Sequence, residues 1–272
     1  MRFRINIFIL SALFLWVSCS TVPITGRRQL NMIPNESILS MSDEQYNNFL
    51  TEHEISSSNR QREEVQEVGE RISHAVEQYL TDNGYAQDLN QYDWEFNLVE
   101  SEEKNAWCMP GGKVVFYTGI LSITENENGL AVVMAHEIAH AVAKHGNERM
   151  SQGLLVQMGG MALTKALETR PAETQDLWLQ AFGITSNLGL LLPYSRLHEK
   201  EADHLGMVFM AMAGYHPQHA LDFWTRMAEL NDTPNPPEML STHPSDEVRI
   251  KQIQELMPEA MAVYEAKSQG KP

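Results

Sequence analysis

Two histidines and a glutamate near the middle of the chain have the types and spacing of a catalytic metal site. They belong to the segment His136-Glu137-Ile138-Ala139-His140. Four positions along an α-helix correspond to about 6 Å of rise and about 40° of rotation, so both imidazoles can reach one ion. Zinc held in this way keeps one position open and lowers the pKa of a bound water, and Glu137 can act as the general base. The pattern predicts a zinc peptidase with one Zn²⁺ per chain; the competing interpretation is a helix with two incidental histidines.

The surrounding sequence predicts that this segment is helical. Thr124 and Glu127 form a capping-box pattern, and apolar residues recur at helical spacing over 130–142. A lysine, a histidine and a glycine over 144–146 are typical of a cationic last turn and its terminator. We therefore expect the two histidines to share one face of a helix that ends near residue 146.

The third ligand has to come from another element. A metzincin would carry glycine at position 143 and histidine at position 146, where this chain has Ala143 and Gly146. The remaining option is a carboxylate on a later helix. Such a helix is expected from Ser195 to Gly214, because Pro193 precedes it.

One stripe of that later helix carries Glu199, Asp203 and Gly206, at positions i, i+4 and i+7. We expect Glu199 to be the metal ligand and Asp203 to orient a ligand histidine through its second ring nitrogen. Gly206 would let the two helices approach. Three other residues lie off the stripe: the rival carboxylate Glu201, and His198 and His204, expected to be solvated or to lie behind the ligands.

These motifs resemble the zinc metallopeptidase family of the CAAX prenyl proteases, HtpX and the mitochondrial Oma-type proteases. The resemblance rests on HEIAH followed about sixty residues later by Ser195–Asp203. Three further stretches extend it over nearly the whole chain after the amino-terminal segment: Thr25–Leu30, Asn105–Gly112 and Ser241–Pro244. Within the family, the chain is expected to resemble the soluble bacterial envelope lipoprotein peptidases of the BepA and LoiP kind. The resemblance implies a gluzincin-like fold and agrees with Glu199 as the third ligand.

The alternating segment 113–118 is predicted to be a strand. The resemblance implies that this strand, through Gly112, Val114 and Phe116, is the sheet edge that holds an extended substrate by main-chain hydrogen bonds. An ordinary strand beneath the zinc helix is the alternative, and it is compatible with that role.

Two interpretations apply to His243. By resemblance, this histidine approaches the zinc from a mobile loop, either as an inhibitory fourth ligand that latches the site or as a donor to the oxyanion. Alternatively it precedes a helix, since residues 244–247 form a plausible first turn and residues 232–237 are typical of a loop.

The amino terminus is typical of a bacterial lipoprotein. Two arginines precede an apolar run over 5–17, which is too short for an ordinary membrane span, so residues 1–18 are predicted to be a signal peptide. Residues 15–19 resemble a lipobox, with Cys19 as the lipidated residue. Residues 19–35 are then expected to form a lipidated tether. Simple cleavage without acylation is the alternative.

The chain has two cysteines in all. If Cys19 carries lipid, Cys108 is expected to be a lone, buried thiol. A Cys19–Cys108 disulfide is the alternative in the absence of lipidation.

Periodicity predicts an α+β fold, mostly α-helical, with a small sheet packed on the active-site helix. One zinc metallopeptidase domain is expected over residues 36–272, an ordinary size for a single core. Besides the two metal helices, we expect helices over 42–53, 61–80, 217–230 and 245–256, strands over 94–99 and 113–118, and two methionine-bearing helices within 150–192. The last two are expected to pack in the core; the alternative is that they cover the cleft or touch a membrane.

The balance of charge is acidic, at −16 for the whole chain, with 43% hydrophobic and 21% charged residues. Such a surface repels nucleic-acid phosphates, so no nucleic-acid partner is expected. We expect instead an unfolded polypeptide substrate, a membrane reached through the amino-terminal lipid, and a link to outer-membrane assembly machinery. The implied location is the periplasmic side of the envelope, at the outer membrane.

The expected function is that of a zinc endopeptidase that hydrolyses unfolded or misassembled envelope proteins as protein quality control. One alternative is a chaperone-like binding lipoprotein whose zinc site is latched by His243 and rarely cuts. Another is a structural zinc module, which predicts a closed coordination sphere and no turnover.

Overall fold

The computed structural model describes residues 19–154, 195–231, 233–234 and 236–270. Two compact units divide the chain: Met1–Asn35 with Gly146–Leu192, and Glu36–His145 with Pro193–Pro272, called here the larger unit. The predicted signal peptide and most of the predicted methionine-bearing helices within 150–192 lie outside the described residues. All the residues of the candidate site belong to the larger unit.

The elements associated with the larger unit follow one another in this order: α2 (Asn35–Glu52), α3 (Asn59–Asp82), η1 (Ala86–Gln91), β3 (Glu95–Val99), β4 (Ala106–Met109), β5 (Lys113–Tyr117), η2 (Thr118–Ile120), α4 (Leu121–Thr124), α5 (Glu127–Val142), α8 (Arg196–Met212), α9 (Gln218–Glu229), α10 (Met239–Thr242) and α11 (Glu247–Ser268). Helices predominate and one small sheet accompanies them, so the predicted α+β, mostly helical class is confirmed. Strand β4 and the short helix α4 were not predicted.

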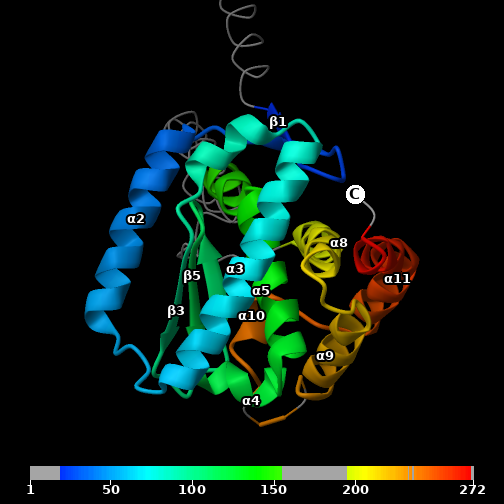
Figure 1. Cartoon of the computed structure of the whole chain (residues 1–272). Coiled ribbons are helices and arrows are strands. Elements are labelled where there is room, and N and C mark those ends of the chain that lie inside the picture. Colours follow the sequence, from blue (N-terminus) through cyan, green and yellow to red (C-terminus); the bar gives the residue numbers. More distant parts are fainter. Residues whose placement is uncertain (1–18, 155–194, 232, 235, 271–272) are drawn as a thin grey trace, which may run out of the picture. The chain divides into compact units, whose positions relative to one another are not determined.

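The three-stranded sheet has the order β3-β5-β4, with β3 parallel and β4 antiparallel to β5. Helix α2 covers one face, where Tyr46 packs on Val99 and Val115 (Figure 1). Helix α3 lies against β3 on the other face, where Gly69 faces the ring of Phe96 so closely that a Cβ would collide with it. The sheet is therefore buried between helices, which explains why all five residues of β5 are buried.

The prediction that segment 113–118 is an open sheet edge is wrong. Val114 is paired with Phe96 on one side and with Cys108 on the other, and Phe116 is likewise paired on both sides. Gly112 is a turn residue with φ +86°, where a Cβ would collide with the ring of Trp94. The turn folds β4 back on β5, so β5 is the central strand and β3 and β4 are the two edge strands of this sheet.

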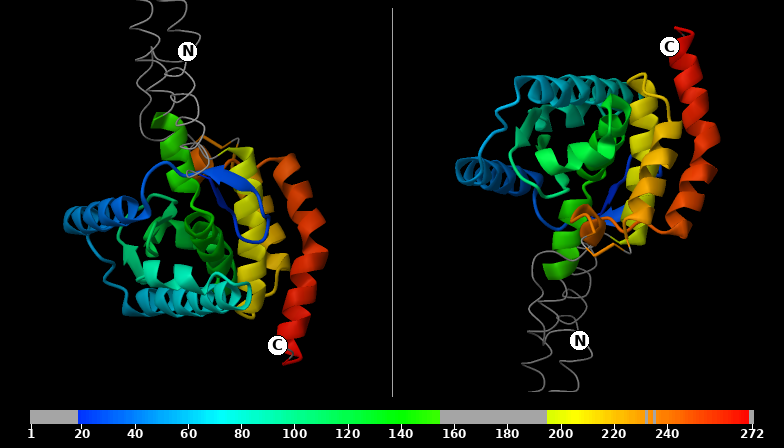
Figure 2. Two further views of the ribbon diagram at one scale, coloured as in Figure 1. Left: turned by 90° about the horizontal axis from the view of Figure 1, so that it is seen from above. Right: turned by 90° about the horizontal axis from the view of Figure 1, so that it is seen from below.

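Helix α5 is central to the larger unit. It packs against α3, β4 and α8, and α11 lies beside α8 on the side away from the sheet (Figure 2). The N-cap is Asn126, whose Oδ1 accepts hydrogen bonds from the amides of Asn128 and Gly129. The predicted capping box is therefore wrong, because Thr124 closes α4 instead.

The carboxyl end of α5 also differs from the prediction. The helix ends at Val142, and Lys144 has φ +56°, a left-handed conformation that terminates helices. A new helical stretch then begins at His145 and continues through the last described residue before the gap, Leu154. Gly146 lies inside this second stretch and is not a terminator.

The segment 19–35 is more ordered than the expected tether. Strands β1 (Cys19–Thr21) and β2 (Arg28–Leu30) form an antiparallel hairpin. Within the same compact unit, Arg27 makes two hydrogen bonds of 2.9 and 2.6 Å to the carboxylate of Glu148. The TGRRQL motif thus has a structural role, while acylation of Cys19 stays a prediction.

Helix α11 starts later and runs further than expected. Asp246 caps it by accepting a hydrogen bond from the amide of Arg249, so Pro244 and Ser245 precede the helix. The helix continues past Pro258 to Ser268. Among the described residues, no helix combines the length and apolarity of a membrane span.

Candidate active site

Four buried side chains converge between α5, α8 and the segment after α10. They are His136, His140, Glu199 and His243, and one ligand atom of each lies within 4.8 Å of every other. Helix α5 places its two histidines one turn apart, with their Nε2 atoms 3.1 Å apart. Helix α8 brings Glu199 opposite, with Oε2 at 3.5 Å from His136 Nε2 and Oε1 at 3.3 Å from His140 Nε2.

This donor set fits one zinc ion. Two ligand atoms at 2.0–2.1 Å from a tetrahedral ion are about 3.3 Å apart, close to the three separations above. Two imidazoles and a carboxylate are also typical ligands of catalytic zinc. The close approach of the helices depends on Gly206, where a Cβ would lie 3.2 Å from the backbone of Ala135 and from the Cα of His136. The predicted role of this glycine is confirmed.

His243 is the fourth member of the cluster. It follows α10 directly, is buried, and lies with Nδ1 at 3.0 Å from Glu199 Oε1 and 3.3 Å from His136 Nε2. Its other ring nitrogen is 3.5 Å from Glu137 Oε1. The structure therefore places His243 within the site, in contact with both the ligand group and the expected base.

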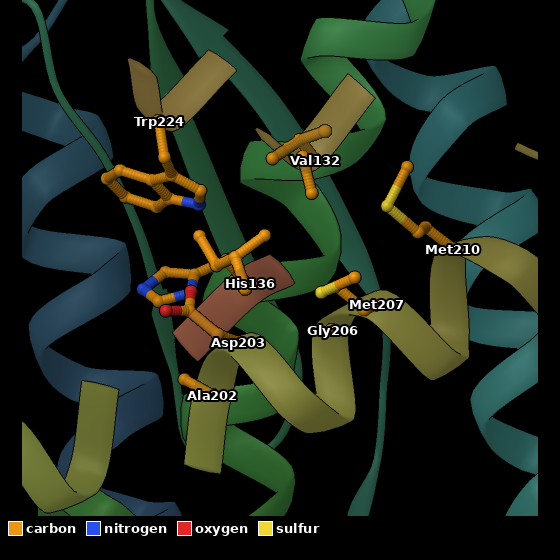
Figure 3. A pocket seen from close by; sticks show the side chains of 10 residues that line it. Val132, His136, Ala202, Asp203, Gly206, Met207, Met210 and Trp224 are labelled. Atoms are coloured by element: carbon orange, nitrogen blue, oxygen red, sulfur yellow. The ribbon is translucent and has the colours of Figure 1, made fainter. Parts of the chain in front are cut away.

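Asp203 and Arg249 lie behind His136. Asp203 Oδ1 is 3.1 Å from His136 Nδ1, as the stripe on α8 predicted (Figure 3). Arg249 donates to both oxygens of Asp203, at 2.9 and 2.7 Å, and its Nη1 is 2.9 Å from Glu199 Oε2. Its guanidinium carbon lies 3.3 Å from the ring centroid of Trp224. A buried arginine thus links the carboxylate behind His136 to the carboxylate of the cluster.

Trp224 and the backs of His136 and Asp203 border a small, largely apolar pocket (Figure 3). The remaining lining residues are apolar side chains and one glycine of α5, α8, α9 and α11: Val132, Ala202, Gly206, Met207, Met210, Ala220 and Ile253. His136 is 2% exposed and Asp203 is 4% exposed, so the hydrogen bond between them is made in a low-dielectric environment.

The charges of the cluster shift several pKa values in the metal-free protein. Burial lowers the pKa of His140 well below its usual value. Burial would lower that of His136 too, but hydrogen bonds to Asp203 and Glu199 raise its pKa to about 9. Burial alone would raise the pKa of Glu199, yet His243 and Arg249 hold it well below its usual range. The site thus keeps a charged carboxylate next to a neutral imidazole.

Glu137 lies beside the cluster and not in it. Its side chain is 2% exposed, and Oε1 accepts no hydrogen bond from the described residues. Burial raises the pKa of Glu137, which moves a carboxylate toward the range of a general base. Cys108 of β4 is near enough for the Glu137 charge to add to the effect of burial in raising the pKa of its thiol. The prediction of a free cysteine at position 108 is confirmed, although the residue is only partly buried.

Three residues off the α8 stripe lie outside the ligand group. Glu201 is paired with His145, with Oε2 at 3.2 Å from Nε2. His198 is buried and stacks on the ring of His145. His204 pairs with Glu259 at 2.9 Å on the far side of α8. Sequence patterns did not identify Arg249 or His145 as neighbours of the site.

Comparison with known proteins agrees with this geometry. Residues 59–257 match the model of Peptidase family M48. The chain belongs to peptidase family M48. It is 32% identical to the mitochondrial metalloendopeptidase OMA1 of Schizosaccharomyces pombe over 90% of this chain and 68% of that protein. It is 30% identical to the mitochondrial metalloendopeptidase OMA1 of Homo sapiens over 94% of this chain.

A bacterial relative matches a shorter part of the chain. The putative beta-barrel assembly-enhancing protease of Vibrio cholerae is 32% identical over 59% of this chain and 34% of that protein. The chain spans about half the length of the human relative. The predicted family is confirmed, and with it the enzyme class of zinc metalloendopeptidase and the zinc cofactor.

Proposed function

We propose that the chain is an endopeptidase that hydrolyses unfolded polypeptides of the bacterial envelope, with zinc held by His136, His140 and Glu199. The observation that carries the proposal is a buried His-His-Glu group with a second buried glutamate, Glu137, directly beside it. Zinc, when bound, supplies the Lewis acid that polarises the scissile carbonyl and acidifies the attacking water.

Glu137 would be the general base in this reaction. Its Oε1 accepts no hydrogen bond from the described residues and faces His243 Nε2 at 3.5 Å, so it would be free to accept the proton of the attacking water once His243 moves away. The raised pKa would let the same carboxyl pass that proton to the leaving amine. Asp203 would fix the tautomer and orientation of His136 by accepting from Nδ1. Arg249 would hold Asp203 in place and balance the buried negative charge.

An extended substrate would bind along β4 rather than β5. Tyr117 N donates to Asn105 O, and alternation along an antiparallel ladder then turns the backbone groups of Ala106 and Cys108 away from β5. Strand β4 also packs against α5, next to Glu137. Main-chain pairing on this edge would bring a peptide past the base without demanding a particular side-chain sequence.

His243 would act as a latch in the conformation described. Its Nδ1 lies among the ligand atoms, where it can complete a four-residue coordination sphere and close the position that the reaction needs. Rotation of His243 away from the cluster would reopen the site. The same contacts favour the second candidate function, a chaperone-like lipoprotein whose latched site rarely cuts.

The cellular setting completes the proposal. Acylation at Cys19 after removal of residues 1–18 would anchor the enzyme on the periplasmic side of the envelope, at the outer membrane. The name of the Vibrio cholerae relative supports a link to β-barrel assembly in that membrane. Misassembled envelope proteins would then be the substrates, and the assembly machinery a partner.

Replacing Glu137 by glutamine tests the assignment. Cleavage of casein should fall by about 10²–10⁴-fold, because a buried amide cannot take the proton. Bound zinc, measured by atomic emission, should stay near one per chain because Glu137 is not a ligand. The exposed Glu229 gives a matched control, and E229Q should be fully active. Undiminished cleavage by E137Q would disprove the assigned base.

Replacing His243 by alanine separates the two candidate functions. A latched enzyme should cleave casein faster once the latch is removed, and its zinc content should persist. The chaperone-like protein should still prevent aggregation of an unfolded protein, and its rare cleavage of casein should be no faster in H243A than in the wild type. A loss of cleavage in H243A would instead assign His243 to the oxyanion.

A further inference from the structure

A series of hydrogen-bonded side chains lies behind His140, on the side away from the ligand cluster. His145 Nδ1 is 2.9 Å from His140 Nδ1, and His145 Nε2 is 3.2 Å from Glu201 Oε2. His145 is 0% exposed and Glu201 is 3% exposed, so both are isolated from solvent. The ring of His198 stacks on His145 at 4.5 Å between centroids.

The break at the end of α5 creates this arrangement. On a continuous helix, a residue five positions after His140 would be rotated by about 140° and would face another direction. The left-handed Lys144 ends the helix, and the chain resumes a helical path at His145. The imidazole of His145 is thereby returned to the back of His140.

The direction of the hydrogen bonds from His140 through His145 is set by the carboxylate of Glu201. An ionised carboxylate only accepts hydrogen bonds, so Glu201 fixes a proton on His145 Nε2. When His145 is the neutral imidazole, its Nδ1 is unprotonated and accepts from His140 Nδ1–H, which is the direction that metal binding through His140 Nε2 requires. The proton of His140 is therefore held on Nδ1, and the lone pair of Nε2 points into the cluster, 3.1 Å from His136 Nε2 and 3.3 Å from Glu199 Oε1.

We propose that His145, held by Glu201, is a positioning residue that keeps His140 in its metal-binding tautomer and ring orientation. The inference rests on the proposed zinc site. His136 has the direct form of the same arrangement, with the Asp203 carboxylate at 3.1 Å from its Nδ1. Each ligand histidine on α5 thus has a carboxylate behind it, one in direct contact and one acting through a second imidazole.

Three variants distinguish positioning from simple core packing. H145F keeps a flat buried ring and removes both hydrogen bonds. H145Q loses the ring and keeps an acceptor and a donor on one side chain. H204F is the matched control, because His204 of α8 also pairs with a glutamate, but with Glu259 of α11 and not with a partner of the ligand histidines.

The measurements are the zinc dissociation constant, by competition with a chromogenic chelator, and the visible absorption spectrum of the Co²⁺-substituted protein. H145F should weaken zinc binding by about 10–100-fold and shift the Co²⁺ bands. H145Q should keep most of the wild-type zinc affinity. H204F should match the wild type. Unchanged zinc affinity in H145F, or H145Q as weak as H145F, would overturn the proposal.

Failure of this inference differs visibly from failure of the proposed function. A wild-type chain that binds no zinc would refute the proposed site itself, whereas tight binding by wild type and H145F alike would refute only the positioning role. If H145F does not fold, E201Q carries the test, because its amide no longer enforces the polarity of His145. E201Q should bind zinc more weakly than wild type, and equal affinity would overturn the proposal.

Discussion

Replacing Arg249 by alanine should cost the metal-free protein about 3–5 kcal/mol of unfolding free energy, the usual result of removing one partner of a buried ion pair. The guanidinium is 4% exposed and makes hydrogen bonds of 2.9 and 2.7 Å to Asp203, with a further contact of 2.9 Å to Glu199. R249A would remove the guanidinium that contacts two buried carboxylates, leaving His136 as their cationic neighbour, and would remove the stacking on Trp224. That loss is a large part of the 5–15 kcal/mol that typically stabilises a domain.

The assay is urea unfolding in the presence of a chelator, followed by circular dichroism. Arg196 gives the control, because its 3.2 Å pair with Asp246 is exposed and R196A should cost less than about 1 kcal/mol. A double-mutant cycle with D203N isolates the pair, since a neutral amide no longer needs the cation; we expect a coupling energy of about 1–3 kcal/mol. A cost for R249A no larger than that for R196A would refute the reasoning.

Three further predictions concern the metal site. G206A should destabilise the protein by about 1–2 kcal/mol in urea unfolding, because the 3.2 Å approach to Ala135 outweighs the gain in helix propensity; stabilisation would contradict this. Zinc at a thousandfold excess over its dissociation constant should add about 4 kcal/mol to the unfolding free energy, and a thermal shift assay of H140A should show no such gain. Because the pKa of His136 is about 9 in the metal-free protein, zinc binding at pH 7 should release about one proton, and its affinity should rise about tenfold per pH unit up to pH 9; calorimetry in buffers of different ionisation enthalpy would show zero release if the reasoning is wrong.

Local sequence patterns identified the parts of the site that depend on a single helix. The spacing of His136 and His140 fixed their common face, and the stripe through Glu199 and Asp203 placed both carboxylates correctly relative to α5. These relations follow from helical geometry alone, whatever the rest of the chain does. The same is true of the predicted segments 61–80 and 217–230, which correspond to α3 and α9.

Relations that depend on tertiary pairing were not predictable in the same way. The sequence predicted β5 as the edge strand, but in the structure β5 is central and β4 lies at an edge. Strand order is set by which strands pair, and the alternation along 113–118 does not reveal that pairing. Arg249 lies 46 residues from Asp203 on a different helix. One signal did exist, since an arginine in the first turn of a helix opposes the helix dipole and therefore calls for a compensating partner.

The predicted helix end near residue 146 was wrong for a local reason. Residues 144–146 have the composition of a helix end, and the helix does end nearby, but the histidine at position 145 begins a new one. A left-handed lysine carries no strong sequence signature, because glycine and asparagine are the residues usually found there.

The guanidinium of Arg249 also holds the peptide chain that leads away from His243. Its Nη1 is 3.4 Å from the His243 carbonyl and 3.2 Å from the Pro244 carbonyl. Withdrawing this stretch as a whole would break those bonds and disturb the Asp203 support of His136. The same arginine therefore holds both the backbone that carries His243 and the carboxylate behind His136. In the latch role proposed for His243, torsion about its side-chain bonds would admit a peptide while the Arg249 contacts to the backbone stay in place.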